Sequence, residues 1–211
     1  MTVLVLDVDG VVVLGNPQGG RWDRWLARDL GIAPETLQAQ FFRRHWRAIA
    51  LGEADMLQVL DEIWHELACA TSARRFVDYW FAQDSLLNHA LLAQVDAWRG
   101  QGNKAFLATV QEHHRAEYLW QTLGLQHHFD AMHYSAALGA AKPDLVFYER
   151  VQAKLPVAAP GEVMFLDDSL RNVEAAMQFG WRARQYTGVG DLVTALAEIS
   201  EYSIDPSTGS G

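Results

Sequence analysis

The stretch VLVLDVDGVVV (residues 3–13) decides how this chain folds. Apolar side chains fill it except at Asp7 and Asp9, and a glycine follows the second aspartate. A short apolar run of this kind is typical of a strand that is buried on both faces of a parallel sheet. Burying carboxylates there costs free energy unless they have partners. The stretch therefore predicts a buried strand that ends in a functional site.

Five segments predict strands of one parallel sheet. Residues 2–8, 104–109 and 162–168 are apolar runs that end in a polar residue, and residues 131–135 and 181–186 are weaker candidates. Helical patterns separate these segments at residues 116–125, 144–155 and 170–180. This alternation predicts an α/β fold, with a Rossmann-like parallel sheet flanked by helices.

An inserted α-helical domain is expected after the first strand. Residues 21–83 show helical spacing and contain no credible strand. The expected core domain is therefore discontinuous, at residues 1–16 and 86–200, and the helical insertion occupies residues 17–85. The small polar residues near the end of the chain predict a flexible tail at residues 201–211.

Polar side chains follow three of the predicted strands. They are Asp7 and Asp9, Thr109, and the pair Asp167 and Asp168. Ligands of open parallel sheets bind beyond the carboxyl ends of the strands, so these side chains are expected to meet. Carboxylates so close together repel one another unless a cation lies between them or one keeps its proton. An all-oxygen pocket of this kind suits Mg²⁺.

A nearby lysine would balance the charge of this site, and the absence of a third acid argues against a calcium loop. Lys142, in the segment GAAKPDLVF, would supply a compensating positive charge, and Pro143 helps to begin the next helix. A calcium loop of the D-x-D-x-D-G kind does not fit, because the third acid is missing and a strand precedes the first two. Asp167 and Asp168 also have an alternative function, since aspartates at that position could cap the helix that follows.

Four segments, LDVDGV, LAT, AAKPD and FLDDSLRN, resemble in order and strand context the four motifs of the haloacid dehalogenase-like (HAD) hydrolase superfamily. The helical insertion between the first two segments resembles the C1 cap of subclass I in that family. The resemblance implies an α/β core with an inserted cap. It also implies a phosphatase-type hydrolase that depends on Mg²⁺.

The resemblance assigns catalytic roles to four residues. Asp7 would attack phosphorus and become an aspartyl-phosphate. Asp9 would protonate the leaving alkoxide and later activate water. Thr109 and neighbouring backbone amides would hold the phosphoryl oxygens, and Lys142 would stabilise the charge on Asp7 and on the transferring group.

The resemblance also implies how the metal is held. Asp7 and Asp168 would bind Mg²⁺ through their side chains, and Asp9 through its main-chain carbonyl. Asp167 and Asn172 would orient the waters around the metal.

Asp9 favours phosphoryl transfer over dehalogenation, because a halide leaving group needs no proton and the dehalogenases lack an acid at that position. One departure from the family is Val110, where many relatives carry Asn or Ser after the threonine. A phosphomutase shares all four motifs and stays open as an alternative. A haloacid dehalogenase and an inactive binding or regulatory module that kept the fold are further alternatives.

Composition excludes several classes of function. The 211 residues are 50% hydrophobic, and a net charge of −9 argues against nucleic-acid binding. No apolar run approaches the ~18 residues that span a membrane, and the first residues lack the pattern of a signal peptide. The only cysteine, Cys69, is expected to be buried in a helix and favours a reducing cytoplasm. No glycine-rich nucleotide motif appears, so neither ATP nor NAD is expected as a cofactor.

The expected partner is a small phosphorylated metabolite, such as a sugar phosphate, and the oligomeric state stays open between monomer and homodimer. Five histidines between residues 113 and 133 show no zinc-ligand spacing and are expected on exposed helices and turns. They are His113, His114, His127, His128 and His133.

Tryptophans of the insertion are expected to pack among its helices. They are Trp22, Trp25, Trp46, Trp64 and Trp80. The basic run Arg43, Arg44, His45 and Arg47 is expected to be solvated, unless one member reaches the substrate.

Overall fold

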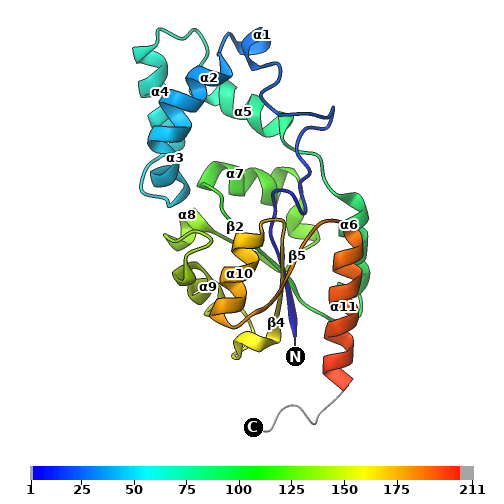
Figure 1. Cartoon of the computed structure of the whole chain (residues 1–211). Helices are drawn as coiled ribbons and strands as arrows, with labels where there is room; N and C mark the ends of the chain where they lie inside the picture. The colour runs from blue at the N-terminus through cyan, green and yellow to red at the C-terminus, as the bar shows by residue number, and fades with distance from the viewer. Residues whose placement is uncertain (1, 205–211) are drawn as a thin grey trace.

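The computed structural model describes residues 2–204 and shows a five-stranded parallel sheet between two layers of helices (Figure 1). The strand order is β3-β2-β1-β4-β5. The strands are β1 (Val3–Leu6), β2 (Ala105–Thr109), β3 (Ala131–Tyr134), β4 (Val163–Asp167) and β5 (Arg182–Gln185). Val5 of the central strand lies opposite Phe106 on one side and Phe165 on the other. The predicted α/β fold with a parallel sheet is confirmed.

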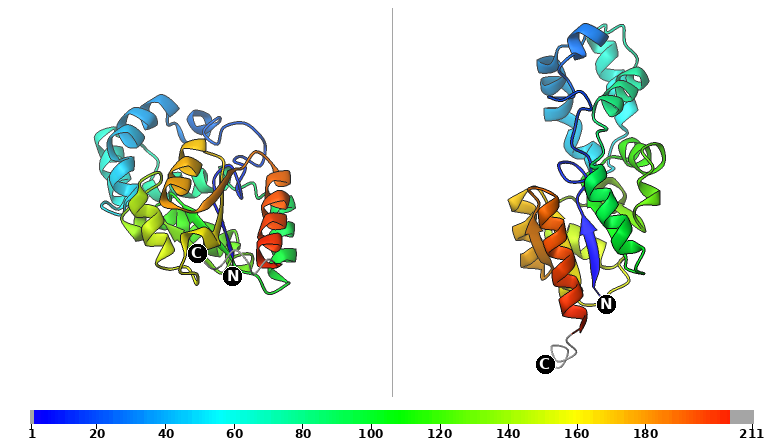
Figure 2. Two further views of the ribbon diagram at one scale, coloured as in Figure 1. Left: turned by 60° about the horizontal axis from the view of Figure 1, so that its bottom comes forward. Right: turned by 90° about the vertical axis from the view of Figure 1, so that its right-hand side faces the viewer.

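The central strand β1 is buried on both faces, as its unbroken apolar sequence predicts. Leu4 and Leu6 pack in an apolar cluster with one layer of helices, and Val3 and Val5 pack with the other. The first layer contains α6 (His89–Arg99) and α11 (Val189–Ile204), and the second contains α9 (Leu145–Gln152) and α10 (Leu170–Phe179). Figure 2 shows both layers. Shorter elements are α7 (His113–Glu117), a π-helical turn (Tyr118–Thr122), α8 (Ser135–Leu138) and 3₁₀ turns at Leu125–His127 and Pro160–Glu162.

The predicted strands and helices are present, and their ends differ by a few residues. The edge strands β3 and β5 are mostly half-buried, which explains why their sequence signal is weak. The helix predicted at residues 116–125 begins earlier, at His113, because the Glu112 carboxylate caps it by accepting hydrogen bonds from the backbone of His114 and Arg115. It then continues as the π-helical turn.

The helical insertion, predicted at residues 17–85, has its helices over the carboxyl ends of the strands (Figure 1). Its elements are α1 (Leu26–Leu30), α2 (Pro34–Leu37), a π-helical turn (Gln38–Phe42), α3 (Arg43–Ala50), α4 (Met56–Glu66) and α5 (Ala73–Gln83). Side chains fix the start of both long helices: Asp55 accepts from the backbone of Gln58 at 2.9 Å, and Ser72 from that of Arg75 at 3.2 Å.

Aromatic packing holds the helical insertion together. As predicted, four tryptophans lie in its core, namely Trp22, Trp46, Trp64 and Trp80. Trp22 stacks on Trp80 with ring centroids 5.2 Å apart. Trp25 is the exception, because it is 37% exposed and is covered by the guanidinium groups of Arg24 and Arg28, 4.7 and 4.5 Å from its ring.

Two local expectations need correction. Cys69 lies in the turn after α4 and is half-buried against the aromatic core, so it is neither helical nor fully buried. Residues 201–204 of the expected flexible tail (201–211) form the end of α11, and residues 205–211 lie outside the described residues. Within residues 2–204, every helix is too short or too polar to cross a membrane.

The expectation of exposed helix and turn histidines is wrong for His133. This residue lies in β3, half-buried, and its Nε2 atom is buried with no hydrogen-bond partner among the described residues. The edge strand carries little apolar pattern, and for that reason the histidine was not predicted to be inside. No histidine belongs to a metal-binding cluster in the described part of the chain.

His133 makes the stability of the protein sensitive to acid. Burial lowers the pKa of His133 to about 4, and Lys154 adds to the effect. The unfolded chain, in which histidine titrates near its ordinary value of 6.5, takes up this proton first. Stability should therefore be lost as the pH falls from about 6.5 to about 4. We expect the His133→Gln variant to be less sensitive to acid. Between these pH values, its free energy of unfolding, measured in urea with EDTA, should fall by on the order of 1–3 kcal/mol less than that of the unmodified protein. Parallel pH curves for the two proteins would contradict this.

Candidate active site

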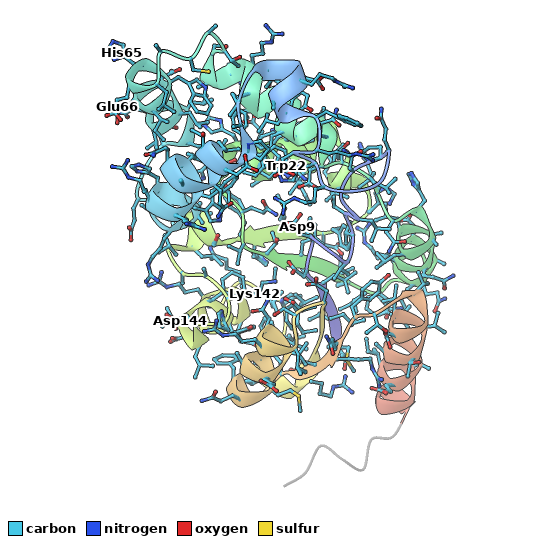
Figure 3. All side chains as sticks on the ribbon, turned by 45° about the horizontal axis from the view of Figure 1, so that its top comes forward. Asp9, Trp22, His65, Glu66, Lys142 and Asp144 are labelled. Carbon is cyan, nitrogen blue, oxygen red and sulfur yellow. The ribbon has the colours of Figure 1, made fainter. Side chains whose placement is uncertain are left out.

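The carboxyl ends of β1, β2 and β4 bring the predicted site residues together. Asp7 follows β1, and its backbone N–H donates to the carbonyl of Leu166 in β4 at 2.9 Å. Thr109 is the last residue of β2, and Asp167 is the last residue of β4. Both are buried. This edge faces the helical insertion, with Asp9 between the insertion and the sheet and Lys142 deeper in the core (Figure 3).

Lys142 joins two of the aspartates in a buried ion-pair network. It lies between α8 and α9, and its Nζ is 2.8 Å from Oδ1 of Asp7 and 2.6 Å from Oδ2 of Asp167. The Lys142 side chain is 1% exposed. Burial alone would lower the pKa of Lys142, but the attraction of Asp7 and Asp167 outweighs it and raises this pKa above its ordinary value. Lys142 is therefore a fixed positive charge beside Asp7.

Asp167 is held by three donors. Besides Lys142, the backbone N–H of Ser169 donates to its Oδ1 at 2.8 Å, and Nδ2 of Asn172 donates to the same oxygen at 3.0 Å. Because both carboxylate oxygens already have partners, Asp167 is suited to orient its neighbours. Asp167 and Asn172 thus lie together, as the sequence predicts, and their action through metal-bound waters stays a prediction.

The carboxylates of Asp7, Asp167 and Asp168 form the one acidic cluster suited to a metal in residues 2–204, with oxygens within 4.8 Å of one another. Burial raises the pKa of Asp7 to about 7 although Lys142 opposes this, and burial and Asp167 also raise the pKa of Asp168. A hard divalent cation would reduce the electrostatic repulsion between these carboxylates, so the cluster fits Mg²⁺.

Gly10 leaves room for Asp168 at this cluster. Its φ is +76°, and a Cβ atom there would lie 2.4 Å from Oδ2 of Asp168. Any other residue would displace that carboxylate, which explains the glycine after the two aspartates. The Asp9 side chain is not a member of the cluster. A metal contact through the Asp9 carbonyl stays a prediction.

Gln111 is a site residue that sequence reasoning missed. Its Nε2 donates to Oδ2 of Asp9 at 2.7 Å and lies 3.4 Å from the hydroxyl of Thr109. The Gln111 residue is 3% exposed. It lies two positions after the end of β2 in a loop without periodicity, and a glutamine there belongs to none of the motifs that were recognised.

A cavity of about 760 Å³ lies between the helical insertion and the core, beside Lys142. Its apolar lining includes Trp46, Leu51 and Val110. Arg47 is the one member of the basic run that reaches it, whereas Arg43 lines another hollow. Val110, the departure from the family pattern, therefore faces a space large enough for a small molecule.

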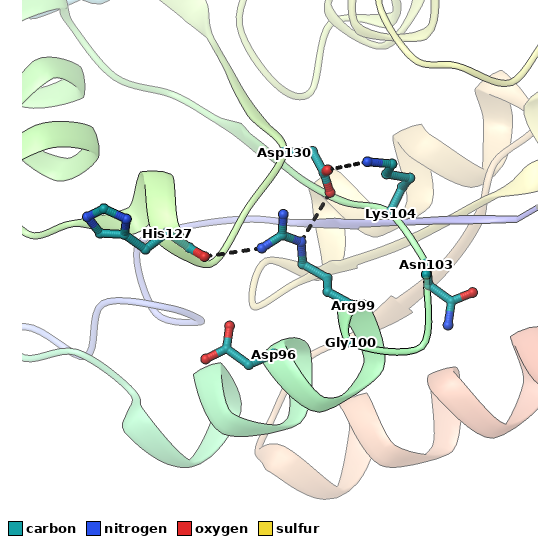
Figure 4. Close-up of a pocket in the computed structure, with 8 residues that line it drawn as sticks. Asp96, Arg99, Gly100, Asn103, Lys104, His127 and Asp130 are labelled. Carbon is teal, nitrogen blue, oxygen red and sulfur yellow. Dashed lines mark hydrogen bonds and ion pairs between the residues drawn. The ribbon is translucent and has the colours of Figure 1, made fainter.

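A second hollow, of about 380 Å³, lies away from these residues (Figure 4). It is at the amino-terminal end of β2 and β3. Asp130 accepts hydrogen bonds there from Lys104 at 2.7 Å and from Arg99 at 3.2 Å. Each charge already has a partner, so this cluster stabilises the end of the sheet and adds nothing to the active site.

Comparisons with known proteins agree with the fold. The family model of haloacid dehalogenase-like hydrolases matches residues 1–180. A predicted HAD-like family hydrolase from Porphyromonas gingivalis superposes with a TM-score of 0.75 and 16% identity, over 95% of this chain and 98% of that one. A HAD family enzyme from Bacteroides thetaiotaomicron, solved with magnesium and inorganic phosphate, gives a TM-score of 0.71 and 16% identity, over 88% and 93% of the two chains.

A curated relative matches a shorter stretch. The sesquiterpene phosphatase astK from Aspergillus oryzae is 46% identical over 52 residues, which is 25% of this chain. The matched stretch spans 26% of that relative. This similarity is local, whereas the family model and the solved structures extend over most of the chain.

Proposed function

The chain belongs to the haloacid dehalogenase-like hydrolase family, and on this premise we propose that it is a Mg²⁺-dependent phosphatase of small phosphomonoesters. The observation that carries the proposal is the position of Asp7. Its carboxylate is 2.8 Å from the buried Lys142 and within 4.8 Å of the carboxylates of Asp167 and Asp168. The proposed nucleophile, a buried positive charge and the carboxylates suited to a metal thus lie together at the edge of the sheet.

The proposed reaction has two steps. In the first, an Asp7 oxygen attacks phosphorus, the bond from phosphorus to the ester oxygen breaks, and Asp9 gives a proton to the leaving alkoxide. In the second, Asp9 takes a proton from a water molecule that attacks the aspartyl-phosphate, which releases inorganic phosphate and restores Asp7. Lys142 stabilises the negative charge on Asp7 and on the transferring group, and Thr109 helps to hold its oxygens.

Asp7 and Asp168 would hold Mg²⁺, with Asp167 and Asn172 orienting the surrounding waters. When bound, Mg²⁺ supplies positive charge that neutralises the phosphoryl oxygens and the crowded carboxylates. The raised pKa values of Asp7 and Asp168 support this assignment, because burial disfavours the ionised form of each carboxylate and a bound cation would stabilise it.

The proton transfer proposed for Asp9 favours a phosphate ester over a haloacid as substrate, since an alkoxide leaving group needs a proton and a halide does not. The phosphatase activity of the sesquiterpene relative and the phosphate complex of the B. thetaiotaomicron enzyme support the same reaction class. We propose that the rest of the substrate occupies the cavity lined by Trp46, Arg47 and Val110.

We further propose that the helical insertion, residues 17–85, acts as a cap that covers the site and selects substrates. The two segments that join it to the core pair with each other, since the N–H of Leu14 donates to Leu86 and the N–H of Leu86 donates to Gly15. This pairing supports boundaries near residues 16 and 86 and a joint about which the cap could close.

A panel of phosphomonoesters assayed with Mg²⁺ and with EDTA tests the proposal. We expect phosphate release from several esters with Mg²⁺, one phosphate for each alcohol, and a loss of about 10³-fold or more with EDTA. Asp61→Asn, an exposed aspartate of the insertion, is the matched control and should behave like the unmodified protein. Equal turnover in EDTA would contradict the role of the metal, and transfer of phosphate to a second sugar position would indicate a mutase.

A further inference from the structure

The hydrogen bond from Gln111 to Asp9 is the strongest unassigned feature of the site. The Gln111 amide donates to Oδ2 of Asp9 at 2.7 Å, with Gln111 buried and Asp9 exposed at the edge of the site. An amide is neutral and neither gives nor takes a catalytic proton at ordinary pH. It can, however, fix the direction of the carboxylate to which it donates.

The backbone of Gln111 is anchored in turn by Ser135. The N–H of Gln111 donates to the Ser135 hydroxyl oxygen at 3.0 Å, and the N–H of Ala136 donates to the Gln111 carbonyl at 3.2 Å. Ser135 is fully buried. The loop that carries Gln111 is therefore tied to the start of α8.

Ser135 also touches the helical insertion. Its hydroxyl is 2.6 Å from the carbonyl oxygen of Ala50, the last residue of α3, and 3.1 Å from that of Gln111; its one proton favours the shorter contact, to Ala50. Close packing supports the contact, because a Cβ on Gly52 would lie 2.4 Å from the carbonyl oxygen of Ala136. Gly52 has a φ of +75°, so both its conformation and its lack of a side chain allow the approach. One line of hydrogen bonds thus runs from α3 through Ser135 and Gln111 to Asp9.

We propose that Gln111 is a positioning residue for Asp9, and that Ser135 makes this positioning depend on docking of the helical insertion. The inference rests on the proposed function, since it concerns the residue that protonates the leaving group. With the insertion docked, the Gln111 amide holds the Asp9 carboxyl where it meets the ester oxygen. With the insertion displaced, Ser135 loses its Ala50 partner, and its hydroxyl proton can turn to the Gln111 carbonyl 3.1 Å away, so the docked geometry of the Gln111 loop is no longer fixed.

The test compares two substrates of nearly equal size, 4-nitrophenyl phosphate and phenyl phosphate. The nitrophenolate ion leaves readily without a proton. The phenolate ion is more basic, so its departure depends more strongly on receiving a proton. In Gln111→Met, which keeps the side-chain volume, we expect kcat/KM for phenyl phosphate to fall about 10- to 100-fold and that for 4-nitrophenyl phosphate less than about threefold. Gln126→Leu, an exposed glutamine with no side-chain partner among the described residues, is the control and should change neither value.

Two further variants connect the effect to Asp9 and to the insertion. In an Asp9→Ala background, Gln111→Met should cause no additional loss on phenyl phosphate, because its partner is already absent. Ser135→Ala should give the same substrate-selective loss, smaller in size. It also keeps the inference testable if Gln111→Met does not fold, as thermal melting would show.

Equal losses on both substrates, or an undiminished Gln111 effect in the Asp9→Ala background, would overturn the inference. An effect of Gln111→Met without any effect of Ser135→Ala would overturn the connection to the insertion. If the unmodified protein hydrolyses neither ester, the proposed function fails instead. The two failures are therefore distinguishable.

Discussion

Asp7→Asn is expected to abolish phosphate release from 4-nitrophenyl phosphate, with a loss of about 10⁴-fold or more. The amide that replaces the carboxylate cannot attack phosphorus and form the acyl-phosphate. Mg²⁺ would also lose one of the two side-chain carboxylate ligands proposed for it. Steady-state rates with saturating Mg²⁺ measure the effect, and Asp61→Asn on the exposed face of α4 is the control.

The same substitution should leave the fold intact. The Asp7 side chain accepts a hydrogen bond from the backbone of Val8 at 2.7 Å, and an asparagine oxygen can accept it equally. Lys142 keeps Asp167 as a partner at 2.6 Å. We therefore expect the free energy of unfolding in EDTA to change by less than about 1.5 kcal/mol. A variant that is folded and still turns over at more than a tenth of the normal rate would remove Asp7 from the mechanism.

Lys142→Met is expected to damage both activity and stability. The variant removes the buried positive charge that pairs with the Asp7 and Asp167 carboxylates. Breaking a buried ion pair by removing one partner costs about 3–5 kcal/mol, because the remaining charge is left without compensation. Urea unfolding in EDTA measures the loss, and the exposed Lys154→Met is the control.

A double variant tests the origin of this cost. When Asp7→Asn is combined with Lys142→Met, fewer carboxylates remain unpaired, so the double variant should be more stable than the sum of the two single effects predicts. Strict additivity of the two stability changes would show that the network is not coupled as described.

Phosphatase activity of Lys142→Met should fall about 10³-fold or more, since the charge beside the transferring group is gone.

The parts of the fold that were predictable are those where burial dictates the sequence. The central strands β1, β2 and β4 are buried along their whole length, so their apolar runs stand out. The edge strands β3 and β5 are largely half-buried and carry charged or polar residues, and their signal was correspondingly weak. His133 was misplaced for the same reason, because polar residues are frequent at such an edge.

The site residues likewise fall into those that the sequence predicted and those that it did not. Asp7, Thr109 and Asp167 were found because each ends or follows a recognisable strand, and Lys142 because of its segment before a proline. Gln111 and the lining of the cavity follow no periodicity, since they are placed by loops and by contacts across the chain. Their positions depend on how the helical insertion meets the core, which no local pattern records.

A crystal structure with Mg²⁺ and beryllium trifluoride, a phosphoryl mimic, tests the central claim most directly. The account predicts beryllium bonded to a carboxylate oxygen of Asp7, with the metal held by Asp168 and with Lys142 and Thr109 contacting the fluorides. The mimic bound elsewhere, or Asp7 remote from both mimic and metal, would contradict it.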